Sequence, residues 1–236
     1  MAAVTVPLRW RGFIHLVVFV WAVYLINVNC SLAITKRHPG ANSYGGRWKY
    51  LTFINLVMQA LFFGLCCLVD MIYQLFYAPH GRCPKFLIKT QDIFFTVFVF
   101  PVGTFVFISF WVLYTIDREL VYPKHIDSII PLWLNHAMHT VIMLLLLIEL
   151  YLQPHQYPRR VKGLMGLALF SALYLAWILW VHQASGIWVY PILAHLSPVK
   201  MVLFFAASAL FMAPLYLLGE KLSHKYWGNV GSQKKE

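Results

Sequence analysis

The stretch Leu51–Asp70 reads LTFINLVMQALFFGLCCLVD, and it lies within an apolar run that covers about residues 50–77. A helix needs roughly 20 mostly apolar residues to cross a bilayer, so this run predicts a membrane-spanning helix. The side chains that interrupt its apolar character are Thr52, Asn55, Gln59, Cys66 and Asp70. Their spacing places them on one face of an α-helix. Because an unpartnered polar group in hydrocarbon is costly, that face must look into a bundle or a cavity.

Five further apolar runs are long enough to span a membrane. We therefore expect an all-α integral membrane bundle of about six transmembrane helices, forming a single transmembrane domain over residues 1–236. The expected spans cover about residues 13–35, 50–77, 92–116, 129–152, 163–184 and 199–218. We expect Pro214 to kink the last span. Two prolines break the apolar segment 186–198, which predicts an interfacial or re-entrant connection with Trp188 and Tyr190 in the aromatic belt.

The composition supports the same class of protein. Hydrophobic residues make up 61% of the 236 residues and charged residues only 11%, against about 45–50% and about 25% in ordinary soluble domains. This excess cannot be buried in one core of this size, which excludes a soluble single-domain enzyme, a disordered chain and a disulfide-stapled secreted domain. The cysteines lack the spacing of a metal site or a disulfide framework, and we expect them to act as small buried apolar residues. They are Cys30, Cys66, Cys67 and Cys83.

The charge pattern predicts the orientation in the membrane. The chain has a net charge of +11, and its basic residues form short clusters between the apolar runs, which favours anionic headgroups over nucleic acid as partners. Of the 19 Lys and Arg residues, 12 fall on the side of the two termini. The positive-inside rule therefore predicts that both termini are cytoplasmic. We expect the first run to be a retained span, in the cell membrane or alternatively in the endoplasmic reticulum.

A second polar cluster lies in the fourth span, at Asn135, His136 and His139. Asn135 and His139 are one helical turn apart. A neutral imidazole can take the proton of a hydroxyl nucleophile near neutral pH, so Thr52 with His139 predicts a nucleophile and its base. The alternative is structural, with the Thr52 hydroxyl bonded to the carbonyl one turn back and His139 as a buried imidazole.

Metal binding is a further alternative for the two histidines. His136 and His139 could be joined by Asp70 or Glu149, but no third ligand has convincing spacing. We therefore expect no metal and no cofactor. A proton pathway through the same four residues is also open, because ionisable groups within spans often serve ion transport.

Several long motifs resemble the androgen-induced gene 1 family, over about residues 44–227. They are Tyr44-Gly-Gly-Arg-Trp-Lys-Tyr-Leu-Thr52-Phe, Phe100-Pro-Val-Gly-Thr-Phe-Val-Phe, Asp117-Arg-Glu-Leu-Val-Tyr-Pro-Lys, Trp133-Leu-Asn-His-Ala-Met-His139-Thr, Gly186-Ile-Trp-Val-Tyr-Pro and Tyr216-Leu-Leu-Gly-Glu. The resemblance implies a multi-pass membrane hydrolase that cleaves fatty acid esters of hydroxy fatty acids. The family's nucleophilic threonine falls on Thr52, and its histidine falls on His139 rather than on His136.

Other polar residues are candidates to support the catalytic pair or to bind the substrate. Asn55, Gln59, Asn135 and His136 are candidates to orient His139 or to stabilise an oxyanion. Gln91 stands where family members carry an arginine. If that arginine holds the substrate carboxylate, another cation must do so here, and the candidates are Arg47 and Lys49.

The reading that competes with catalysis is a non-catalytic membrane protein that binds lipid or regulates a coagulation inhibitor. Such a protein would tolerate the loss of the Thr52 hydroxyl, whereas a threonine hydrolase would not. Membrane lipids are partners under either reading, and the pattern of residues does not determine the oligomeric state.

Overall fold

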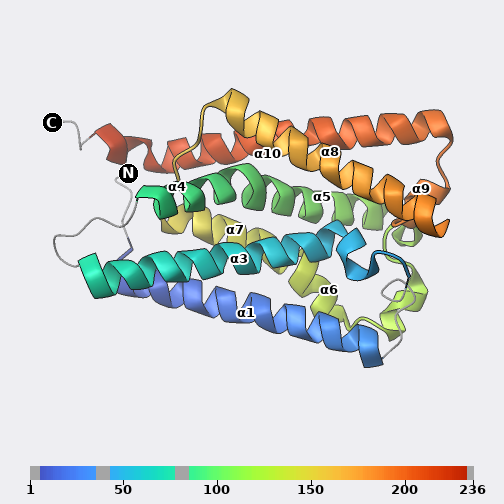
Figure 1. Cartoon of the computed structure of the whole chain (residues 1–236), viewed down its shortest axis with the longest axis horizontal. Helices are drawn as coiled ribbons and strands as arrows, with labels where there is room; N and C mark the ends of the chain where they lie inside the picture. The colour runs from blue at the N-terminus through green and yellow to red at the C-terminus, as the bar shows by residue number, and fades with distance from the viewer. Residues whose placement is uncertain (1–5, 36–42, 78–84, 233–236) are drawn as a thin grey trace.

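The computed structural model describes residues 6–35, 43–77 and 85–232 (Figure 1). Its described part consists of helices joined by short connections, without strands. In chain order the elements are α1 (Leu8–Thr35), η1 (Gly46–Lys49), α3 (Leu51–Ile72), η2 (Tyr73–Tyr77), α4 (Lys85–Ile93), η3 (Phe94–Val99), α5 (Phe100–Ile116), η4 (Arg118–Leu120), η5 (Lys124–Ser128), α6 (Leu132–His139), α7 (Val141–Leu152), α8 (Arg160–Ser185), α9 (Pro191–Ala194) and α10 (Pro198–Ser232).

Six helical stretches of the described residues are long and apolar enough to cross a membrane, which confirms the predicted all-α bundle. They are Leu8–Leu32, Leu51–Leu75, Lys85–Ile116, Leu132–Leu152, Arg160–Ser185 and Pro198–Gly228. The third and sixth stretches extend beyond their predicted bounds, to Lys85 and to Gly228. These extensions lie outside the most apolar segments, where helical hydrogen bonding continues but hydropathy no longer marks it. The sixth helix continues through Pro214.

The inner part of the bundle is formed by α3, α5 and α7, with α1 beside α3 and with α8 and α10 on the opposite side (Figure 1). Phe62 of α3, Phe100 of α5 and Leu146 of α7 are fully buried in one apolar cluster. In contrast, α8 and α10 expose large apolar side chains such as Leu169 and Leu210. A lipid-facing surface has this character, because hydrocarbon solvates apolar groups.

The first turn of α1 and the last described turns of α10 lie at the same end of the bundle (Figure 1). We call this the terminal end; α3 ends there, α4 begins there and α7 ends there. The opposite end, where α3 begins and α5 ends, is called the far end. Six spans among the described residues place the start of α1 and the end of α10 at the same end of the bundle.

The third span is continuous but contains the π-helical segment η3 just before Pro101. Proline has no N–H to donate to the carbonyl four residues back, and its ring crowds that carbonyl. A widened turn relieves this crowding within a helix that otherwise continues. The helix therefore runs unbroken from the terminal end to Phe110, which contributes to the site at the far end.

Candidate active site

A glycine turn leads the chain into α3 at the far end. Gly45 and Gly46 have φ angles of 77° and 52°, in a region that glycine adopts without steric strain. A Cβ at Gly45 would also lie 3.2 Å from the side chains of Trp177 and Val181. The turn passes into η1, and α3 then begins at Leu51, so Thr52 is its second residue.

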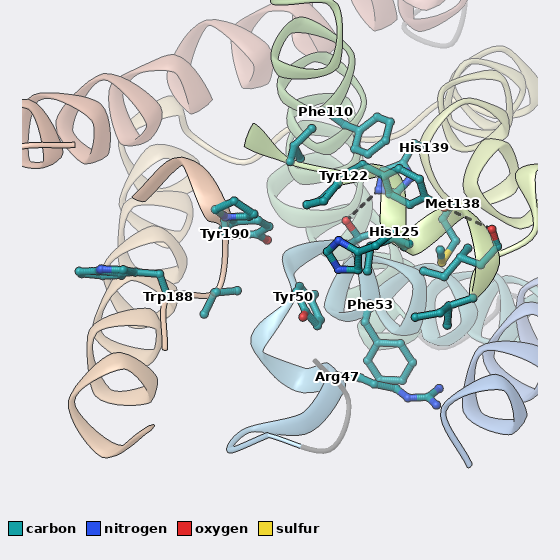
Figure 2. Close-up of a pocket in the computed structure, with 18 of the residues that line it drawn as sticks. Arg47, Tyr50, Phe53, Phe110, Tyr122, His125, Met138, His139, Trp188 and Tyr190 are labelled. Atoms are coloured by element: carbon teal, nitrogen blue, oxygen red, sulfur yellow. Dashed lines mark hydrogen bonds between the residues drawn. The ribbon is translucent and has the colours of Figure 1, made fainter. Parts of the chain in front are cut away.

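Thr52 and His139 are hydrogen-bonded across the bundle. The Thr52 Oγ1 to His139 Nε2 distance is 3.1 Å (Figure 2). The other ring nitrogen, Nδ1, lies 3.0 Å from the main-chain oxygen of Asn135. A carbonyl oxygen only accepts hydrogen bonds, so Nδ1 carries the proton. In the neutral imidazole Nε2 is then an acceptor, and the Thr52 hydroxyl donates to it.

Packing fixes the ring of His139 in this orientation. The Phe110 ring stacks on it with centroids 3.7 Å apart and an angle of 14° between the planes. His139 is the last residue of α6, and the helix is interrupted at Thr140 before α7 begins. His139 is buried, so its position depends on the Phe110 stack and the Asn135 carbonyl rather than on solvent.

Thr52 and His139 line a pocket of about 550 Å³ at the far end. Its walls come from α1, η1, α3, α5 and α6 and from the segments Val121–Ile130 and Gly186–Ala194, as Figure 2 shows around the labelled side chains. Most lining side chains are apolar, and the polar ones include Asn29, Arg47 and His125. This balance of an apolar wall with a few polar groups is typical of a site for a lipid or another largely apolar ligand.

The connection after α8 also fixes the start of α3. The backbone N–H of Leu51 donates to the Tyr190 hydroxyl over 2.9 Å, and the hydroxyls of Tyr190 and Tyr174 are 2.9 Å apart. Tyr174 donates in turn to the carbonyl of Lys49 over 2.9 Å. The Tyr190 hydroxyl therefore accepts the first N–H of α3. That Trp188 and Tyr190 lie in an aromatic belt stays a prediction. Burial raises the pKa of the Tyr190 hydroxyl, which keeps it protonated.

Of the two predicted cations, only Arg47 lines the pocket. Its guanidinium donates to Asn29 Oδ1 over 2.7 Å and to the Cys30 carbonyl over 2.9 Å. Burial lowers the pKa of Arg47, but an arginine remains charged at neutral pH. Lys49 instead donates to Ser43, and its ammonium lies 5.4 Å from the centre of the Tyr50 ring. Burial lowers the pKa of Lys49 as well.

The predicted supporting residues do not reach the pocket walls. Asn55 and Gln59 are buried deeper along α3, beside Gly103 of α5. Asn135 contributes its main-chain carbonyl, while its buried side-chain oxygen has no hydrogen-bond partner among the described residues. His136 is exposed, stacks on Trp111 and shares a hydrogen bond of 3.0 Å with Thr140.

The residues that the metal site or the proton pathway would have to bring together lie apart in the structure. His136 and His139 point to different surroundings, one exposed and one in the pocket. Asp70 and Glu149 lie on the last turns of α3 and α7, at the terminal end. Gln91 also lies there, on α4, where its amide donates to the Cys66 sulfur over 3.0 Å. A side chain at position 91 is therefore remote from the pocket. Cys83 lies outside the described residues.

Comparison with known proteins gives the family. The family model described as FAR-17a/AIG1-like protein matches residues 10–224. The androgen-dependent TFPI-regulating protein of Homo sapiens is 42% identical over 94% of this chain and 95% of its own length. The androgen-induced gene 1 protein of Homo sapiens is 45% identical over 84% of this chain and 85% of its own.

A more distant relative is a UPF0641 membrane protein of Schizosaccharomyces pombe, 30% identical over 92% of both chains. No solved structure matches the chain. The family match covers the first span as well as Thr52, His139 and the connections around the pocket. The chain belongs to the FAR-17a/AIG1-like family of membrane proteins.

Proposed function

We propose that the chain is an intramembrane lipid esterase in which Thr52 is the nucleophile and His139 is the general base. The observation that carries this proposal is the 3.1 Å contact between Thr52 Oγ1 and His139 Nε2. The Asn135 carbonyl holds the proton of His139 on Nδ1 and leaves Nε2 free to accept. A threonine hydroxyl is a weak nucleophile unless a base of this kind takes its proton.

The reaction runs in two halves. Thr52 Oγ1 attacks the ester carbonyl carbon and passes its proton to His139 Nε2. The tetrahedral intermediate then expels the alkoxide of the hydroxy fatty acid, which takes the proton from His139 and leaves an acyl-threonine. A water molecule attacks the acyl group, again losing a proton to Nε2, and the released threonine oxygen recovers that proton. Each half returns His139 to its neutral form.

The beginning of α3 favours the negative charge that develops in both halves. The N-terminus of a helix carries a partial positive charge. Thr52 lies in the first turn of α3. An oxyanion formed on its substrate therefore lies close to this end of the dipole, which stabilises the transition state.

The pocket favours an ester of a fatty acid with a hydroxy fatty acid as the substrate. Its apolar walls and its volume of about 550 Å³ suit acyl chains. Arg47 is the one permanently charged side chain among the described residues of the wall. Two of its five donors are used by Asn29 and Cys30, so others remain for the free carboxylate of such a substrate.

The direct test uses the purified full chain in lipid nanodiscs with a synthetic fatty acid ester of a hydroxy fatty acid. We expect release of both acids with time, measured by mass spectrometry. A lipid-binding protein without catalysis would retain the intact ester instead. Intact ester recovered in full from folded, ligand-bound protein would refute the proposal.

Replacing Arg47 by glutamine is expected to raise KM at least about tenfold for the free-acid substrate, because a charge-assisted hydrogen bond contributes about 1.5–3 kcal/mol. We expect kcat to change little, since Arg47 contacts the carboxylate and not the ester. The methyl ester of the same substrate is the control, and its KM should be equal in both proteins. An equal rise for both substrates would contradict the carboxylate role.

Replacing Tyr190 by phenylalanine removes the acceptor of the Leu51 N–H and the donor to Tyr174. A buried polar group left without a partner costs about 1–3 kcal/mol. We expect a lower thermal midpoint and a kcat about tenfold lower, because the start of α3 positions Thr52. Tyr24→Phe, at an exposed tyrosine on α1, is the matched control and should behave as the wild type. An unchanged kcat in Tyr190→Phe would contradict the positioning role.

We infer that both termini face the cytoplasm, in the cell membrane or the endoplasmic reticulum. The far end with its pocket then faces the outside or the lumen. Tags at the N- and C-termini should both be digested by protease added to the cytoplasmic side of sealed vesicles. Protection of both tags would invert the orientation, and protection of one would contradict six spans.

A further inference from the structure

A second cluster of ionisable side chains is buried at the terminal end, away from the pocket. His15 of α1 and Glu149 of α7 are completely buried, and His155, in the connection after α7, is 7% exposed. The His15 Nε2 atom lies 3.0 Å from Glu149 Oε2, and the His155 Nε2 atom lies 2.9 Å from Glu149 Oε1. The two imidazoles, on different segments, thus each direct the Nε2 atom at the Glu149 carboxylate.

The other ring nitrogen of each histidine contacts a second carboxylate. His15 Nδ1 is 2.6 Å from Asp70 Oδ2, and His155 Nδ1 is 3.1 Å from Asp92 Oδ1. Histidines that bind a metal through one nitrogen almost always donate the other N–H to a carboxylate or a carbonyl, which fixes the ring. Asp70 is itself held by Arg11, whose Nε lies 2.9 Å away.

A sulfur atom supplies a third ligand beside His15 and Glu149. Ligand atoms of His15, Cys66 and Glu149 all lie within 4.8 Å of one another. Bond lengths of about 2.0–2.3 Å in a tetrahedral zinc site place its ligand atoms about 3.3–3.8 Å apart, so small side-chain movements close this distance. Gln91 donates to the Cys66 sulfur over 3.0 Å, and Gln153 donates to Glu149 Oε1 over 2.7 Å.

We propose that His15, Cys66 and Glu149 bind one Zn²⁺ ion that ties together α1, α3 and α7, with the fourth position of the ion left to water and with His155 holding the second oxygen of Glu149. An imidazole, a thiolate and a carboxylate are ligands that zinc accepts.

Binding of zinc to this set releases two protons, one from His15 Nε2 and one from the Cys66 thiol. The thiolate and the carboxylate then balance the two charges of the ion. This neutrality suits a buried site, because net charge in a low-dielectric interior is costly.

Without the ion, the same groups remain compatible with burial. Each imidazole then carries protons on both nitrogens, because both face carboxylate oxygens. The two imidazolium charges and the Arg11 guanidinium balance three carboxylates. Zinc therefore replaces the proton of His15 Nε2, a nitrogen that already faces an oxygen of Glu149, and Asp70 keeps the ring in place.

The test uses the full chain purified in detergent, stripped with a chelator, dialysed against Zn²⁺ and desalted. We expect about one zinc per chain by elemental analysis, and a higher thermal midpoint with zinc than without. His15→Gln and Glu149→Gln should bind at least about tenfold less zinc per chain than the wild type, since an amide is a poor replacement for either ligand. His224→Gln, at an exposed histidine on α10, is the matched control and should keep it.

Cobalt tests the sulfur ligand and does not depend on how well a charge-removing variant folds. Co²⁺ added to the stripped wild type should give a thiolate charge-transfer band that Cys66→Ala lacks. Less than about 0.1 zinc per wild-type chain would overturn the proposal, as would equal zinc in His15→Gln and His224→Gln. The result is independent of ester hydrolysis, because Thr52→Val should bind zinc as the wild type does.

Discussion

Thr52→Val is expected to abolish ester hydrolysis, with kcat at least about 10³-fold lower, while the protein stays folded. Valine keeps the branched shape of threonine and a restricted χ1 angle, but it has no hydroxyl. The loss therefore reports on chemistry rather than on packing. The rates of acid release from a fatty acid ester of a hydroxy fatty acid, measured in nanodiscs, check this prediction.

Thr52→Ser is the matched control for this substitution. Serine retains the hydroxyl that donates to His139 Nε2 and lacks only the methyl group, which restricts the rotamer. We expect reduced but measurable turnover. A folded Thr52→Val protein that hydrolyses the ester at the wild-type rate would refute the nucleophile assignment.

His139→Ala is expected to lower kcat by about 10²–10⁴-fold, the usual contribution of a general base. The substitution also leaves the Phe110 ring without its stacking partner, so the thermal midpoint should be measured together with the rate. The rate of acid release from the same ester in nanodiscs checks this prediction.

His136→Ala provides the matched control on the same helix. His136 is exposed and bonded to Thr140, outside the pocket wall, so we expect a much smaller effect on kcat. If His136→Ala were inactive and His139→Ala active, the roles of the two histidines would be reversed.

The helices and the polar side chains within them could be predicted from the sequence. Spans are long apolar runs, and Thr52 and His139 interrupt such runs. The assignment of the base to His139 rather than His136 came from the resemblance to the family. Their contact could not be derived from spacing, because it depends on the break at Thr140, which sets the direction of α6. No periodic pattern marks such a break.

The walls of the pocket could not be predicted. His125 lies on the one-turn helix η5 and Tyr190 on the connection before α9, and segments this short carry no hydrophobic periodicity that would give their direction. Asn55 and Gln59 share a helical face with Thr52 but lie deeper in the bundle, so a shared face does not place residues at the same depth. The buried cluster at the terminal end joins segments far apart in sequence, and His15 alone within the first span gave little sign of it.

Covalent labelling tests the central claim most directly. A lipid-like fluorophosphonate should react with the hydroxyl that His139 activates, and mass spectrometry of the digested protein identifies the modified peptide. We predict one adduct, on Thr52, that is absent in Thr52→Val and strongly reduced in His139→Ala. An adduct on another hydroxyl, with Thr52 unmodified in catalytically active protein, would contradict the assignment of Thr52 as the nucleophile.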